Sequence, residues 1–357
     1  MTWRAGWPVG VALLAVAVPR LLVGAAAPAA AHSVGGAQAS NYQTRIRAIE
    51  PSVDGLQVEV VDAGARLRLH NATGQEVVVL GDAGEPYLRL GPAGVFENRR
   101  SPATYRNRVR TAPAPPPAHA DPAAPQEWRR LSRGDAVAWY EHRAHWTDPG
   151  DPPAVRAAPD RSHLVIPSWQ VDLRVGGQPV QVTGEVRWIP GPQPWPWAGA
   201  AAGWLLAALA ATAGGRRPRL VAALTGLLVA VDVAHTASIW AATSASVAAK
   251  AYGSLPSAVG WALAVLAVRR LLGSGPERAG IYLLLATVIL VMVGGLGDLD
   301  SLSSSQLASA LPTPVTRALV AATLGLGAAL AIVGLRWSQP STGGSGRRGP
   351  AAERGAC

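Results

Sequence analysis

The 357-residue chain is poor in several residue types that define common protein classes. It has one cysteine, the terminal Cys357, so no disulfide can form within the chain. It has two methionines and one phenylalanine, so neither a methionine-lined metal path nor a phenylalanine-rich core is expected. Charged residues make up 15% of the chain, below the roughly 25% of soluble globular proteins. These shortages exclude a disulfide scaffold, a coiled coil and a wholly soluble enzyme.

Lysine is also scarce, since Lys250 is the single lysine among 32 basic residues. The net charge is nevertheless +10, and a basic balance can indicate a nucleic-acid partner. The arginines are scattered, and many stand beside apolar runs. Membrane topology explains this distribution better than nucleic-acid binding, so the bilayer is the expected partner and no nucleic acid is expected.

The first 31 residues have the pattern of a secretory signal peptide. Arg4 precedes an apolar stretch from Val9 to Ala27, and small residues lead to Ala31. Cleavage after Ala31 would place alanine at positions −3 and −1 and make His32 the new N-terminus. Cleavage after Ala29 and an uncleaved N-terminal anchor are the alternatives.

Residues 32–197 are polar and predict an exported all-β domain. Short alternating runs separated by Pro, Gly, Asp and Asn predict seven strands, at 42–49, 56–61, 65–69, 76–80, 163–166, 170–175 and 180–188. Gly176-Gly177 suits a hairpin turn, and the Pro- and Ala-rich stretch Thr111–Pro125 predicts an irregular insertion. The pattern favours an antiparallel sandwich of the Ig-like or cupredoxin-like kind.

Residues 198–337 predict an all-α membrane domain of five transmembrane helices. The apolar stretches lie near 198–214, 219–241, 255–273, 279–297 and 314–335, and each approaches the roughly 20 residues that span a bilayer. Most arginines of this half fall on one side of the spans. The positive-inside rule puts that side and the tail 338–357, predicted to be disordered, in the cytoplasm, with the β domain outside a bacterial membrane.

Three histidines of the exported half, His32, His142 and His145, are candidate metal ligands. A histidine at a mature N-terminus offers its amine and its ring Nδ1 to one metal ion. A further imidazole would build the nitrogen-rich environment that Cu(II) prefers. His142 and His145 lie three residues apart, so both rings face one way only if the segment turns. The alternative is that they are surface histidines beside a Trp-rich core edge.

Two ionisable residues, Asp232 and His235, lie on one face of the second predicted span. Charged groups inside a membrane are costly and are usually functional. Asp298, at the outer end of the fourth span, is expected at a similar depth. Asp300 is expected there as well. The four residues predict a metal site with nitrogen and oxygen ligands, or a proton relay, beneath the exported domain. The alternative is that Asp232 pairs with His235 and that Asp298 and Asp300 cap a helix.

The exported half resembles the copper-binding domain of particulate methane monooxygenase, and copper-resistance carriers of the C type joined to their membrane D partner. It shares with them a β domain that begins with histidine and carries a later histidine pair. The methane monooxygenase pair is H-x-H, whereas Tyr140 stands where its first histidine would fall, so the resemblance leaves His145 or Tyr140 as third ligand. Gly84–Arg89, Glu97–Tyr105 and the His142/His145 segment resemble a family of uncharacterised actinobacterial membrane proteins.

Together these features predict a membrane protein that captures Cu(II) outside the cell and delivers it to or through its helices. The shortage of Met and Cys favours Cu(II) over Cu(I) as the cargo. Two alternatives stay open. One is a copper-dependent oxidase, and the other is a metal-free envelope protein whose β domain binds another protein.

Overall fold

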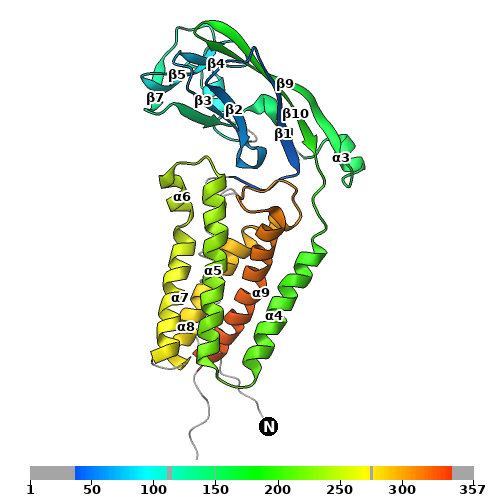
Figure 1. Cartoon of the computed structure of the whole chain (residues 1–357), viewed down its shortest axis with the longest axis vertical. Helices are drawn as coiled ribbons and strands as arrows, with labels where there is room; N and C mark the ends of the chain where they lie inside the picture. The colour runs from blue at the N-terminus through cyan, green and yellow to red at the C-terminus, as the bar shows by residue number, and fades with distance from the viewer. Residues whose placement is uncertain (1–36, 111–114, 149, 274–275, 340–357) are drawn as a thin grey trace, which may run out of the picture.

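The computed structural model describes residues 37–339, apart from 111–114, 149 and 274–275. It has an N-terminal β part and a C-terminal helical part, stacked along the long axis of the molecule (Figure 1). The predicted signal peptide and the tail from residue 340 lie outside the described residues. The prediction of an antiparallel β region followed by a helical region is confirmed.

The β part consists of two antiparallel sheets. The first has seven strands in the order β1-β10-β9-β4-β5-β6-β7, and the second has three in the order β2-β3-β8. The strands are β1 (Tyr42–Glu50), β2 (Leu56–Val61), β3 (Arg66–Asn71), β4 (Val77–Leu80), β5 (Pro86–Gly91), β6 (Gly94–Asn98), β7 (Trp128–Ser132), β8 (Ala136–Trp139), β9 (His163–Val175) and β10 (Gln178–Trp188).

The two sheets share one apolar core because their strands alternate between buried and exposed side chains. In β3, Leu67 and Leu69 are buried while Arg68 between them is exposed. Leu67 and Leu69 belong to the same buried cluster as Val77 of β4 and Leu173 of β9. The core therefore lies between the sheets, and removing one of these leucines is expected to destabilise both.

Six strands cover the seven predicted segments, since 163–166 and 170–175 form the single strand β9. The predicted hairpin at Gly176-Gly177 is confirmed, and both glycines have positive φ, 55° and 87°. Strands β5 to β8 were not predicted. The first two are bounded by Pro86, Gly91 and Gly94, which are strand-breaking residue types, and β7 is rich in exposed polar residues.

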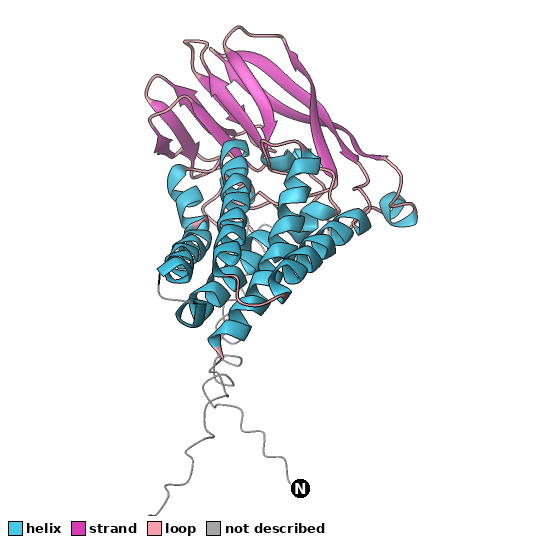
Figure 2. Ribbon diagram, turned by 60° about the horizontal axis from the view of Figure 1, so that its bottom comes forward, coloured by secondary structure: helices cyan, strands magenta, loops and turns pink. Residues whose placement is uncertain are grey.

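The helical part contains five helices long and apolar enough to span a membrane, which confirms the multi-pass prediction. They are α4 (Trp195–Ala213), α5 (Pro218–Ala242), α7 (Leu255–Gly273), α8 (Pro276–Leu290), which continues through the π-helical turn η5 (Val291–Leu296), and α9 (Thr313–Ser338). Figure 2 shows the helices packed side by side beneath the sheets. Helix α9 is the most buried of the five spans.

The β part is tied to the helices at two places. Asp62, in the turn between β2 and β3, accepts hydrogen bonds from the backbone N–H of Ser244 at 2.7 Å and from its hydroxyl at 2.5 Å. Ser244 lies just after the end of α5. On the other side, Ser40 and Gln306 exchange two backbone hydrogen bonds of 3.0 and 2.8 Å. These contacts hold the segment before β1 against the loop that leads into α9.

Candidate functional site

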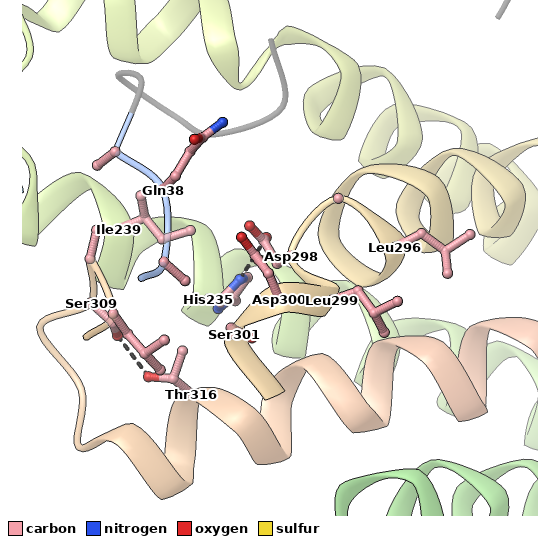
Figure 3. A pocket seen from close by; sticks show the side chains of 15 residues that line it. Gln38, His235, Ile239, Leu296, Asp298, Leu299, Asp300, Ser301, Ser309 and Thr316 are labelled. Carbon is pink, nitrogen blue, oxygen red and sulfur yellow. Dashed lines mark hydrogen bonds and ion pairs between the residues drawn. The ribbon is translucent and has the colours of Figure 1, made fainter. Parts of the chain in front are cut away.

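A cavity of about 320 Å³ lies at the junction of the two parts (Figure 3). Most of its lining comes from the helical half, and the rest is the chain segment just before β1. The lining includes Ala37, Gln38 and Ala39 from that segment, and His235, Asp298, Asp300, Ser309 and Thr316 from the helical half. The cavity therefore joins the start of the β part to the ionisable residues predicted from the second and fourth spans.

His235 and Asp298 form the ionisable pair of this cavity. His235 lies in the last third of α5, and Asp298 follows η5 at the end of the fourth span. Their side chains meet with Nε2 of His235 2.9 Å from Oδ2 of Asp298, as Figure 3 shows. His235 is 3% exposed. Its Nδ1 is buried and has no hydrogen-bond partner among the described residues.

Asp232 lies one helical turn before His235 on α5 but binds a different residue. The indole N–H of Trp261 on α7 donates to its Oδ2 at 2.7 Å. Its Oδ1 is buried without a hydrogen-bond partner in the described part of the chain. This oxygen lies against Gly294 of the π-helical turn, where an added Cβ would be 2.2 Å away. The alternative of an Asp232–His235 pair is not seen, because each residue has its own partner.

Asp300 lines the same cavity as Asp298, two residues further along the chain. Burial raises the pKa of the Asp300 carboxyl, and the nearby charge of Asp298 raises it further. Behind them, Arg317 of α9 is buried and donates to the carbonyl oxygens of Ser301 at 3.1 Å and Ser304 at 2.7 Å. Arg317 thereby fixes the chain that follows the two aspartates.

No three His, Cys, Asp or Glu side chains within the described ranges are arranged to hold a metal ion. The predicted ligands His235 and Asp298 are brought together, whereas Asp232 is bound by Trp261 outside the cavity lining. The site that the helices form by themselves is a histidine–carboxylate pair open to a cavity.

The candidate histidines of the β part have other surroundings. His142 begins the 3-10 turn η4 (His142–Ala144), and its Nε2 donates to the carbonyl of Val109 at 2.9 Å. His145 is 6% exposed. Both of its ring nitrogens face backbone carbonyls, Nδ1 that of Glu141 at 2.6 Å and Nε2 that of Gly64 at 2.8 Å. Neither nitrogen of His145 is free to bind a metal in this arrangement.

Burial lowers the pKa of His145, although its contacts with the two carbonyls work in the opposite direction. Tyr140, the other candidate third ligand, has its hydroxyl hydrogen-bonded to Arg66 at 2.9 Å, and the guanidinium of Arg66 lies over its ring. His32 lies outside the described residues. In this structure His142 and His145 are thus hydrogen-bonded to backbone carbonyls.

The two neighbours of Asp232, Trp261 and Gly294, were not found from the sequence. Trp261 stands in an apolar span and resembles the other tryptophans of the chain. Gly294 and its neighbour Gly295 are small residues of the kind that allow close helix packing, which gives no sign of a polar contact. The available signal was the acidic residue itself, because a carboxylate inside a bilayer needs a donor from a neighbouring helix, and tryptophan supplies one while staying largely apolar.

Comparison of the chain with family models, curated proteins and solved structures gave no match.

Proposed function

We propose that the protein is a membrane-bound copper-capture protein in which Cu(II) enters the junction cavity from the outside and meets His235 and Asp298. The single observation that carries the proposal is the pair of buried His235 and half-buried Asp298 at the wall of a cavity of about 320 Å³. Delivery to or through the helices would start from this pair. The β domain, on this proposal a sandwich of the Ig-like or cupredoxin-like kind, covers the cavity.

The chemistry of the pair supports a divalent cation as the cargo. An imidazole and a carboxylate are both ligands of Cu(II) and related ions. The other ring nitrogen of His235, Nδ1, has no hydrogen-bond partner among the described residues. An ion that binds to His235 therefore breaks at most one buried hydrogen bond of this ring, the one to Asp298. The two aspartates of the cavity, Asp298 and Asp300, attract a cation into a low-dielectric space.

The proposal also includes His32, which lies outside the described residues. Ala37 lines the cavity, and His32 precedes Ala37 by five residues. An extended chain of that length spans at most roughly 18 Å. On this proposal, cleavage after Ala31 brings the amine and ring nitrogen of His32 to the cavity, where they join His235 and Asp298 in a nitrogen-rich site. The Cu(II) site then lies between the two halves of the protein.

The arginines support the orientation on which the proposal depends. Seven of the eight arginines in residues 198–339 gather at the end far from the sheets, at positions 216, 217, 219, 269, 270, 278 and 336, whereas Arg317 lies near the junction. The positive-inside rule favours a cytoplasmic location for this end, and hence a β domain and cavity outside. An exported protein that presents copper, or receives it, is the expected partner.

The test is Cu(II) binding by the full-length mature protein in detergent, measured by equilibrium dialysis and electron paramagnetic resonance. One Cu(II) per chain is expected. One extra residue before His32 should weaken binding, because the amine no longer chelates, and His235→Leu should weaken it more than about a hundredfold. His70→Leu is the matched control, because His70 forms a comparable pair with Asp135 on the surface of the β part. Unchanged binding in the His235→Leu protein would contradict the proposal.

A further inference from the structure

A second concave surface lies at the opposite end of the helices, far from the junction cavity. It is a groove of about 540 Å³ between the start of α5 and the end of α7. Its lining consists of Arg217, Pro218, Arg219 and Leu220 on one side and Leu271 and Leu272 on the other. Two cationic side chains therefore face an apolar floor, at the level where the spanning helices end.

The start of α5 offers backbone donors to this groove. Helix α5 is 25 residues long, and no side chain caps its first turn. Pro218, the first helical residue, has no N–H group, whereas the N–H groups of Arg219 and Leu220 have no partner within a helix. A helix N-terminus also carries partial positive charge. The groove thus combines backbone donors with two guanidinium groups.

The two arginines are arranged differently. Arg217 donates from Nη1 to the carbonyl of Ala211 at 3.1 Å, near the end of α4, and this bond holds its guanidinium at the rim. Arg219 is exposed and forms no hydrogen bond or ion pair within the described part of the chain. Seven arginines of the helical half lie at this end. The charge around the groove is therefore strongly positive.

The two leucines that line the groove indicate which class of ligand it suits. Leu271 is buried, whereas Leu272 is 62% exposed on the outer face of the spanning helices. A free anion gains nothing from exposed leucine, but the acyl chains of a lipid do. Basic pockets between spanning helices on the cytoplasmic side are suited to anionic headgroups. We propose that the groove between α5 and α7 binds the phosphodiester headgroup of an anionic glycerophospholipid.

This inference is independent of copper, so its test measures lipid. The full-length protein is purified in neutral detergent and mixed with phosphatidylglycerol or phosphatidylcholine, and the bound lipid is counted by native mass spectrometry. Phosphatidylglycerol should bind more tightly than phosphatidylcholine. The double change Arg217→Gln/Arg219→Gln should weaken that binding roughly thirtyfold, since each basic residue contributes a factor of several. Arg336→Gln, which changes an exposed arginine at the same end outside the groove, should have little effect.

A lysine variant and a competition with inorganic phosphate complete the test. If the Arg217→Gln/Arg219→Gln protein does not insert into the membrane, Arg217→Lys/Arg219→Lys replaces it in the test. Lysine keeps the positive charge that sets the topology but lacks the planar guanidinium that binds a phosphate through two hydrogen bonds, so weaker lipid binding is again expected. Inorganic phosphate at millimolar concentration should not displace the lipid. Equal binding of the two lipids, equal weakening by Arg336→Gln, or displacement by phosphate alone would overturn the assignment.

Discussion

His145 in the β part and His235 in the helical part are both buried histidines, with 6% and 3% of their surfaces exposed. They differ in what faces their nitrogens. His145 has a backbone carbonyl at each ring nitrogen, so the fold uses both. His235 has a carboxylate at one nitrogen, no partner among the described residues at the other, and a cavity beside it. Burial is therefore common to the two histidines, whereas unused hydrogen-bonding capacity distinguishes His235 from His145.

In the helical part, Gly294→Ala is expected to have the largest effect on stability. An added Cβ would lie 2.2 Å from Oδ1 of Asp232, so the carboxylate or the π-helical turn must shift, at a cost of about 3 kcal/mol. Gly226→Ala is the matched control on α5, where a Cβ meets nothing within 4 Å. Thermal unfolding in detergent measures both. Equal unfolding midpoints for the two variants would show that Oδ1 of Asp232 does not pack against Gly294.

His145→Asn tests the other half of the comparison. An asparagine can donate to one of the two carbonyls that His145 contacts, so the β part should lose about 2 kcal/mol. Copper binding by the full-length protein should not change, because neither nitrogen of His145 takes part. Calorimetry gives the first result and equilibrium dialysis the second. A stable variant that binds copper poorly would reverse the roles assigned to the two histidines.

Much of this arrangement could be predicted from the sequence. The five spans follow from apolar length, and β1 to β4 follow from alternation. The meeting of His235 with Asp298 was expected from their similar depth, because a membrane limits where polar groups of different helices can lie. The depth of Asp232 was predicted in the same way, but its partner Trp261 was not, since side-chain rotation around a helix is set by packing.

The surroundings of His142 and His145 could not be predicted, for a physical reason. Their spacing is compatible with a shared metal site or with separate contacts. Which of these forms depends on where the carbonyl groups of Gly64 and Val109 lie in the fold, and both residues belong to segments far from the histidines in the sequence. Periodicity carries no information on such contacts. Strands β5 and β6 were missed because glycine and proline mark both loops and tight hairpins.

Ser244→Ala should have a smaller effect, and it tests whether the two halves are coupled. The hydroxyl of Ser244 donates to Asp62 across the junction, so its loss should cost about 1 kcal/mol and leave the backbone N–H contact in place. Ser303→Ala, at an exposed serine of the same junction, is the control. Thermal unfolding of both proteins is compared. If Ser303→Ala lowers the unfolding midpoint as much as Ser244→Ala does, the hydrogen bond from Ser244 to Asp62 does not couple the two halves.

The smallest effect is a pH dependence that belongs to His145. Because burial lowers its folded-state pKa below the unfolded value of about 6.5, the unfolded chain binds the proton more readily. Stability is therefore full above about pH 6.5 and falls as the pH drops below it. The difference in unfolding midpoint between wild type and His145→Asn should shrink between pH 7.5 and 5.5. A difference that grows on acidification would show that the folded pKa is raised instead.

The most direct measurement of the central claim compares two double variants of the full-length mature protein by electron paramagnetic resonance after Cu(II) titration. One is His142→Asn/His145→Asn in the β part, and the other is His235→Leu/Asp298→Asn at the junction cavity. The first protein should still bind one Cu(II) with an unchanged spectrum, whereas the second should lose it. Loss of the signal in the first protein, with the signal retained in the second, would place the copper site in the β domain and overturn the proposed function.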